Sequence, residues 1–119
     1  MPAPLHSVYS CPVELALDVL GGKWKTVLLA HLKQGPLRYG ELRRRVPTLS
    51  DKMLTQRLHE LEQLGLIARA DEDPARYRLT ARGESLRPVL QTLYECGQAL
   101  ADELEITVGQ RSNGPRTSG

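Results

Sequence analysis

Apolar residues recur with helical spacing over most of the chain and alternate with polar ones in one short stretch. Cys11-Pro12 opens a largely apolar segment that predicts a first helix, because proline suits the first helical position. Gly21-Gly22 ends that helix, and a second apolar helix is expected over about 23–33. The first helix is apolar on nearly all sides, which suggests burial within a dimer as well as in a monomer core.

Two further helices joined by a tight turn are expected next. The first covers about 40–46, and Ser50 then provides a good N-cap for a helix over about 51–64. Gly65 follows where a left-handed C-terminal cap would be needed. The apolar stripe of the second helix consists of Leu54, Leu58, Leu61 and Leu64.

From residue 66 onward the pattern changes to that of a β-hairpin. Strands are expected at 66–70 and 76–79 around the polar turn 71–74, because the second strand alternates polar and apolar residues. Thr80 is expected to cap one long helix over about 81–108. Residues 1–10 form an N-terminal arm in this interpretation, and residues 109–119 a disordered tail.

The order of these elements predicts a mainly α fold with a small β-hairpin (α+β). It is that of a winged helix-turn-helix over residues 11–108, with the recognition helix at about 51–64 and the wing at about 66–79. Additional N- and C-terminal helices flank this unit. Such a unit places its second helix in the major groove of DNA, and the first helix braces it against the backbone.

Length and cysteine content indicate a small cytoplasmic protein. The 119 residues suit one domain, and two cysteines do not make a secreted disulfide framework. We find neither an apolar run long enough to span a membrane nor a secretory signal. The histidines His6, His31 and His59 show no metal-ligand spacing, so no metal, cofactor or catalytic residue is expected.

Basic residues are concentrated in one part of the chain. The net charge is only +2, but residues 38–57 contain six basic residues against two acidic ones. Residues 58–105 contain ten acidic residues against five arginines. One basic segment on an otherwise acidic chain suggests a surface that binds a polyanion, although an ordinary solvated charged surface is the alternative.

Helical geometry selects the residues that would contact DNA. With the leucine stripe facing inward, Lys52, Thr55, Gln56 and His59 point outward. Gln56 can address adenine, Thr55 a base or a thymine methyl group, and Lys52 a guanine or a phosphate. Arg57 lies at the stripe's edge, where it can reach a phosphate or the neighbouring Glu60. The predicted groove contacts are Ser50, Lys52, Thr55, Gln56 and Arg57.

Arginines outside the recognition helix are candidates for further contacts. Arg43 and Arg44, with Arg45, are expected to contact phosphates, or else to form a solvated face. Arg76 and Arg78 flank the wing tip and are candidates for the adjacent minor groove. The acidic residues at 71–73 argue against deep insertion of the tip.

Several motifs, in order, resemble the HxlR-type winged-helix regulators. They are Cys11–Glu14, Asp18–Trp24, Tyr39–Arg44, Leu54–Leu58, Leu61-Glu62, Gly65-Leu66, Tyr77–Thr80, Gly83 and Leu86–Leu90. The resemblance covers about residues 8–104 and implies a DNA-binding dimer whose first and last helices form the interface. The short hairpin departs from the family pattern, as does Cys96-Gly97, where the family often has an aromatic residue before glycine.

Cys11 is a candidate redox residue, because a helix N-terminus favours the thiolate and nearby Lys23 or Lys25 could add to this effect. The resemblance implies the same, since some relatives use a cysteine at the matching position to sense oxidants or electrophiles. Such a switch would pair Cys11 with Cys96 or with the partner's Cys11. The alternative is a small apolar residue that packs the helix.

The function expected from the sequence is that of a homodimeric, sequence-specific regulator of transcription, acting as a repressor. Its partner would be double-stranded DNA with a pseudo-palindromic operator, and its effector a small oxidant or electrophile. The alternative is a winged-helix module that docks an acidic protein without specific DNA binding. The polar set Lys52, Thr55 and Gln56 favours DNA, because protein-docking faces tend toward exposed apolar anchors.

Overall fold

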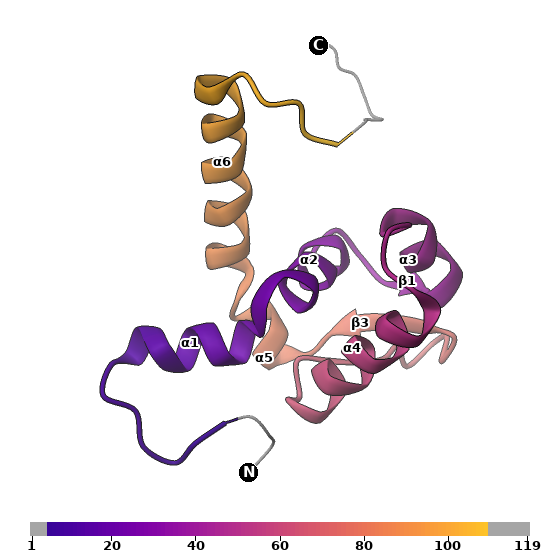
Figure 1. The fold of residues 1–119 in the computed structure, drawn as a ribbon. Helices are drawn as coiled ribbons and strands as arrows, with labels where there is room; N and C mark the ends of the chain where they lie inside the picture. The colour runs from indigo at the N-terminus through magenta and orange to yellow at the C-terminus, as the bar shows by residue number, and fades with distance from the viewer. Residues whose placement is uncertain (1–4, 110–119) are drawn as a thin grey trace. The chain divides into compact units, whose positions relative to one another are not determined.

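The computed structural model describes residues 5–109, and the chain divides between Arg87 and Pro88 into two units. The start of the predicted arm and nearly all of the predicted tail lie outside the described residues. The elements, drawn in Figure 1, are α1 (Pro12–Leu20), α2 (Gly22–Leu32), β1 (Leu37–Arg38), α3 (Tyr39–Arg45), α4 (Asp51–Gln63), β2 (Ile67–Arg69), β3 (Arg76–Leu79), α5 (Ala81–Glu84) and α6 (Arg87–Leu104).

Leucines from three helices form the core of the first unit. The stripe predicted for the recognition helix is buried, as are the inward residues of α2 and α3. Helix packing of this kind holds α4 through its apolar side and leaves its opposite side in solvent. The fully buried side chains from these helices are Leu28, Leu29, Leu32, Leu42, Leu54, Leu58 and Leu61.

Capping residues set the ends of α4. The Ser50 hydroxyl accepts a hydrogen bond from the backbone N–H of Met53 at 3.1 Å, as expected for an N-cap. Gly65 follows the helix with a φ of 75°, which places it in the left-handed region that glycine adopts without strain. The predicted helix boundaries of this element are therefore close to the observed ones.

The hairpin belongs to a three-stranded antiparallel sheet with the order β1-β3-β2. Strands β2 and β3 are those expected from the sequence, whereas β1 was not predicted. Leu37 of β1 lies opposite Tyr77 of β3, and Arg38 lies opposite Arg76. A strand of two residues is too short for alternation to reveal it, and its pairing depends on residues far along the chain.

The structure differs from the expected single helix over 81–108. Helix α5 ends at Glu84, and α6 begins at Arg87 and ends at Leu104. Pro88 explains the break, because it has no N–H to donate to the carbonyl of Glu84 and its ring clashes with that group. At the other end, Glu105 takes a φ of 56°, which is outside the helical region.

Each unit leaves apolar side chains in solvent. Val13 and Leu17 of α1 are 61% and 62% exposed. Helix α6 exposes Leu93, Leu100 and Leu104 in the same way. Large contiguous apolar surfaces are uncommon on monomers, so both helices are candidates for protein contacts. Within residues 5–109, no helix has the length and apolar character needed to cross a bilayer.

Candidate nucleic-acid interface

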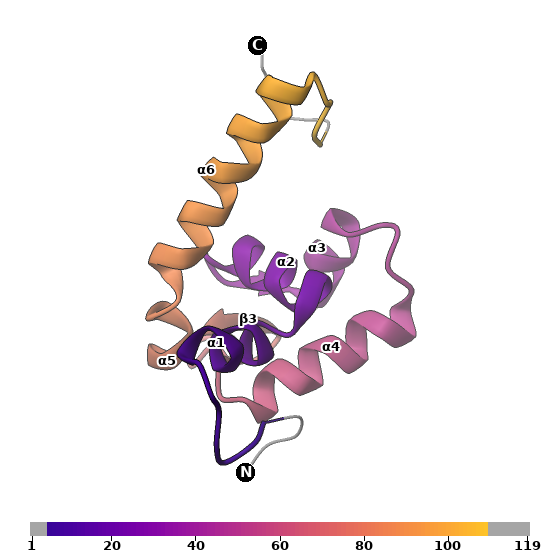
Figure 2. The same cartoon turned by 60° about the vertical axis from the view of Figure 1, so that its left-hand side comes forward.

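The outer side of α4 carries the residues predicted to contact the groove. Figure 2 shows α3 and α4 joined by a turn, with α4 extending along one side of the first unit. Lys52, Thr55, Gln56 and His59 are all exposed, and Ser50 is exposed at the start of the helix. The structure therefore places these side chains on a helix surface that no other described part of the first unit covers.

One carboxylate links α3 to the first turn of α4. The Tyr39 hydroxyl donates to Asp51 Oδ1 at 2.7 Å, and Arg43 Nε donates to the same oxygen at 2.9 Å. The hydrogen bond from Tyr39, together with the positive charge of Arg43, holds the pKa of Asp51 below its ordinary value. Asp51 and Tyr39 were not among the predicted site residues; their contact joins residues of two different helices.

The other arginines of α3 are exposed. Arg45 donates to the side-chain carbonyl of Gln34 at 3.2 Å, whereas Arg44 makes no side-chain hydrogen bond to residues 5–109. A backbone hydrogen bond from Arg38, assisted by nearby arginines that include Arg44, holds the pKa of Glu41 below its ordinary value. Arg44 is therefore the arginine of α3 with the greatest freedom to contact an external anion.

Arg57 lies against Glu60, the intramolecular partner considered for it from the sequence. Its guanidinium donates to Glu60 and approaches the sulfur of Met53 at 3.9 Å. Glu60 also lies 3.8 Å from the buried ammonium group of Lys25 in α2. The Glu60 carboxylate thus contacts both Arg57 and Lys25. Because Arg57 already has this partner, it is less available to DNA than Lys52.

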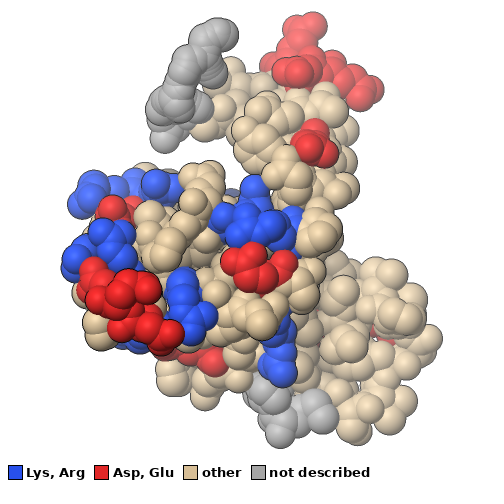
Figure 3. All heavy atoms as spheres, turned by 180° about the vertical axis from the view of Figure 1, so that it is seen from behind, with Lys and Arg blue, Asp and Glu red and all other residues tan. Residues whose placement is uncertain are grey.

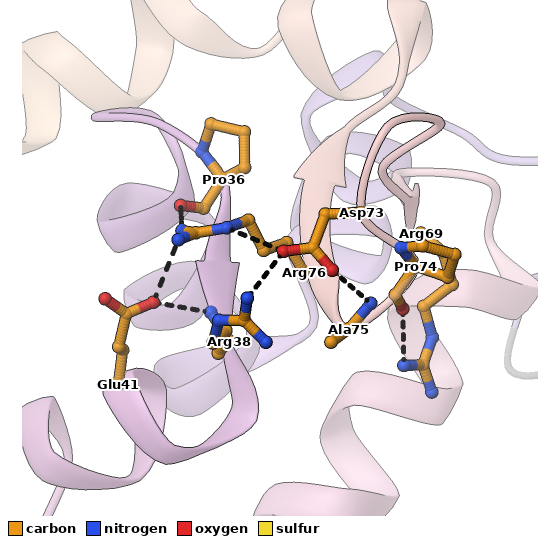
Figure 4. A network of polar contacts seen from close by, with 8 residues as sticks. All are labelled: Pro36, Arg38, Glu41, Arg69, Asp73, Pro74, Ala75 and Arg76. Carbon is orange, nitrogen blue, oxygen red and sulfur yellow. Dashed lines mark hydrogen bonds and ion pairs between the residues drawn. The ribbon is translucent and has the colours of Figure 1, made fainter.

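The basic side chains of the wing are held inside the first unit. Arg76 donates to Asp73 at 3.2 Å and to the carbonyl of Pro36 at 3.3 Å, and lies 3.6 Å from Glu41 (Figure 4). Arg38 donates to the same Asp73 carboxylate at 2.7 Å. These contacts join the hairpin turn to β1 and to the start of α3.

The remaining hairpin arginines also have partners. Arg69 stacks on the Tyr77 ring at 4.3 Å and donates to the carbonyl of Pro74 at 3.1 Å. Arg78 donates to the carbonyl of Leu79 at 3.1 Å. On the face drawn in Figure 3, basic and acidic side chains lie next to one another and do not form one uniformly positive surface.

The two cysteines are exposed free thiols in separate units. Cys11 is the N-cap residue of α1, and its side chain makes no capping hydrogen bond. The lysines expected to assist it have other partners: Lys23 lies 4.7 Å from the Trp24 ring centroid, and Lys25 pairs with Glu60. Within the described residues, no three His, Cys, Asp or Glu side chains form a group suited to a metal ion.

Comparison with known proteins identifies the family. The model of the HxlR-like helix-turn-helix family matches residues 19–105. An uncharacterized HTH-type transcriptional regulator of Methanothermobacter thermautotrophicus is 45% identical over 101 residues, which are 82% of this chain and 77% of that protein. The regulator YybR of Bacillus subtilis, also uncharacterized, is 42% identical over 108 residues, or 87% of this chain and 84% of YybR.

Solved structures agree with this assignment. The reduced form of the redox regulator HypR matches with a TM-score of 0.72 and 39% identity, covering 82% of this chain and 100% of that one. The quinone-bound YodB of B. subtilis matches with a TM-score of 0.60 and 36% identity, covering 78% of this chain and 99% of that one. The chain therefore belongs to the HxlR-like helix-turn-helix family and is a transcriptional regulator of the helix-turn-helix type.

Proposed function

We propose that this regulator binds a specific double-stranded DNA site as a homodimer and represses transcription from it. The observation that carries the proposal is the two-sided character of α4. Leu54, Leu58 and Leu61 bury one side, and Lys52, Thr55 and Gln56 stand in solvent on another. A helix of this kind fits the major groove, where base edges offer distinct patterns of donors and acceptors.

The residues of this surface have different roles in the proposal. Thr55 and Gln56 contact base edges, and Lys52 contacts a base or a phosphate. Ser50, at the N-terminus of α4, contacts the DNA backbone. Arg43 and Arg44 contact phosphates next to the groove. Arg57 is a secondary contact, since Glu60 already holds it. Arg76 and Arg78 support the hairpin from within, which lets the wing approach the flanking minor groove without deep insertion.

The homodimer is supported by the exposed apolar side chains of α1 and α6. Val13 and Leu17 on one helix, and Leu93 and Leu100 on the other, lose contact with water if a second copy covers them. A two-fold dimer would place two α4 helices about 34–36 Å apart on a pseudo-palindromic site. Sedimentation of the purified chain, alone and with a selected duplex, tests the stoichiometry.

Selection from random duplexes tests the DNA-binding proposal directly. The expected result is a pseudo-palindromic consensus whose affinity falls steeply with salt. Lys52→Ala should reduce the slope of log K against log salt by about 1 if Lys52 neutralises one phosphate. A monomer that prefers no duplex, even in dilute buffer, would refute the proposal and favour the alternative of a winged helix that docks an acidic protein.

We further propose that Cys11 makes DNA binding responsive to oxidants or electrophiles. The thiol is exposed at the start of α1, and two structural relatives are the redox regulator HypR and the quinone-bound YodB. Its disulfide partner in this proposal is either Cys96 or the partner's Cys11. Non-reducing electrophoresis after diamide treatment, with Cys11→Ser and Cys96→Ser as controls, tests this; absence of any crosslink or adduct, with DNA binding retained, would refute it.

A further inference from the structure

Asp51 is an unexpected residue for a surface that binds DNA. It lies in the first turn of α4, and its side chain is 74% exposed. A carboxylate in this position repels the phosphate backbone and lowers the affinity for every duplex. Its contacts within the protein suggest what offsets this cost.

A single oxygen of Asp51 joins the two helices of the helix-turn-helix. Oδ1 accepts from the Tyr39 hydroxyl at 2.7 Å and from Arg43 Nε at 2.9 Å. Tyr39 and Arg43 are four residues apart on α3, so both project from the same side of that helix. The Thr55 hydroxyl, one turn along α4, lies 3.5 Å from the Tyr39 oxygen. The junction between α3 and α4 is therefore organised around this carboxylate.

Arg43 is fixed at two points and keeps donors to spare. Its Nε donates to Asp51, and its NH1 group donates to the carbonyl of Val46 at 3.3 Å. A guanidinium has five N–H donors, and the other three bond to no group within residues 5–109. Because the planar group is already held, it can bond to a phosphate with a smaller loss of rotamer freedom than a mobile arginine.

We propose that Asp51 is a positioning residue, which together with Tyr39 fixes Arg43 so that its free N–H groups contact a DNA phosphate when α4 is correctly seated in the groove. The inference rests on the proposed DNA-binding function. In a loosely bound complex the Asp51 carboxylate only repels the phosphate backbone of the DNA. In the seated complex the bonds from the fixed Arg43 to the phosphate recover that loss, so Asp51 increases discrimination between sites.

Asp51→Asn in the full chain tests the inference. Asparagine keeps the size of the side chain but removes the charge that holds Arg43. Anisotropy titrations would compare the selected duplex with a scrambled duplex of the same length and composition, over a range of salt concentrations. We expect the affinity for the scrambled duplex to rise about threefold and that for the selected duplex to fall about threefold, so that their ratio falls about tenfold.

Two further variants distinguish the positioning of Arg43 by Asp51 from the effect of removing a negative charge. Asp71→Asn removes the same charge from the hairpin turn, where the exposed carboxylate has no bonding partner among the described residues. This control should raise both affinities equally. Arg43→Lys keeps the positive charge but loses the Nε donor, so it should lower the ratio, and adding Asp51→Asn to it should change the ratio little.

If Asp51→Asn raises the affinities for the selected and the scrambled duplex equally, Asp51 acts only as a repulsive charge. If it lowers both equally, Asp51 has only a structural role. Either result overturns the inference. If the wild-type chain selects no site at all, the proposed function itself fails. Thermal unfolding monitors the fold. If Asp51→Asn is unfolded, Tyr39→Phe carries the test, since it removes one of the two donors and should lower the ratio about threefold.

Discussion

Helix α4 and the β2–β3 hairpin both present basic side chains, but they hold them in different ways. On α4, Lys52 and Gln56 project into solvent without a side-chain partner in the described part of the chain. On the hairpin, Arg76 and Arg69 are bonded to Asp73 and to the carbonyl of Pro74. Lys52 and each hairpin arginine carry the same formal charge, but the number of donors available to an external partner differs.

This difference gives the two regions different roles in the proposed binding of DNA. A side chain with no partner in the protein gives up only hydrogen bonds to water when it binds a base or a phosphate. A paired arginine must also break its ion pair with a carboxylate, which costs free energy. The α4 surface is thus suited to contact DNA, and the Asp73 network is suited to hold the hairpin in place. Substitutions in each region test this division, and the effects expected range from a large loss of stability to a small change in acid sensitivity.

The largest effect is expected when α4 loses its support in the core. Leu58 is 1% exposed beneath the outer surface of the helix, so Leu58→Ala should lower the free energy of unfolding by about 2–5 kcal/mol. Urea unfolding measures this. His59→Ala, on the outer side, is the matched control and should stay within about 0.5 kcal/mol of the wild type. Equal losses in both variants would contradict the two-sided description of α4.

Base discrimination should distinguish the two regions most directly. Gln56→Ala is expected to relax the preference at one base pair by about 1–3 kcal/mol, because the proposed bidentate contact to adenine would be lost. Arg76→Ala should weaken binding to all duplexes to a similar degree and leave the preference unchanged, because it only loosens the hairpin. Competition titrations with single-base variants of the selected site measure both. A change of preference in Arg76→Ala would assign base readout to the wing.

The α4 side of this comparison could be predicted from sequence, since it depends on local signals. A leucine stripe at helical spacing, Ser50 before the helix and Gly65 after it are all readable within about fifteen residues. The buried leucines, the cap and the left-handed glycine are found in the structure as expected. The outward positions then follow from geometry alone.

The hairpin side depends on contacts that local patterns do not reveal. Arg38 bonds to Asp73 from 35 residues away, and β1 exists only because Leu37 pairs with Tyr77. Asp73 lies only three residues before Arg76, but nothing near Arg38 in the sequence shows that it shares the same carboxylate. The break before α6 is different: Pro88 was visible, but the apolar stripe on both sides of it suggested one continuous helix.

A variant that frees the hairpin arginines should make the two regions more alike. Asp73→Asn removes the carboxylate shared by Arg38 and Arg76, which frees the guanidinium of Arg38 for phosphates and leaves Arg76 held only by Glu41 and the carbonyl of Pro36. We expect the affinity for any duplex to rise about twofold to threefold and stability to fall by less than about 1 kcal/mol. Glu72→Gln, an exposed neighbour without a bonding partner in residues 5–109, controls for charge. Equal gains in the two variants would show that the network does not restrain the arginines.

The smallest effects concern acid sensitivity, which depends on Asp51 of α4 and on Glu41 of α3, the residue that lies 3.6 Å from Arg76 of the hairpin. The backbone N–H of Arg38 lowers the pKa of Glu41, and the Tyr39 hydroxyl lowers that of Asp51. A carboxyl whose pKa is depressed in the folded state stabilises the fold above its unfolded pKa and loses that contribution as the pH falls through its folded pKa. The melting temperature should therefore be nearly constant down to about pH 5 and decline at lower pH.

Substitution of each carboxylate should flatten this acid decline to a different extent. Glu41 is influenced by three arginines in addition to the backbone donor, whereas Asp51 has Tyr39 and Arg43, so Glu41→Gln should flatten the decline more than Asp51→Asn. Both effects should be small, because exposed charges are screened by solvent and salt. Thermal unfolding from pH 7 to pH 3 at low salt measures them. A steeper decline in either variant would mean that the carboxylate opposes the fold, and the description of that region would have to be reversed.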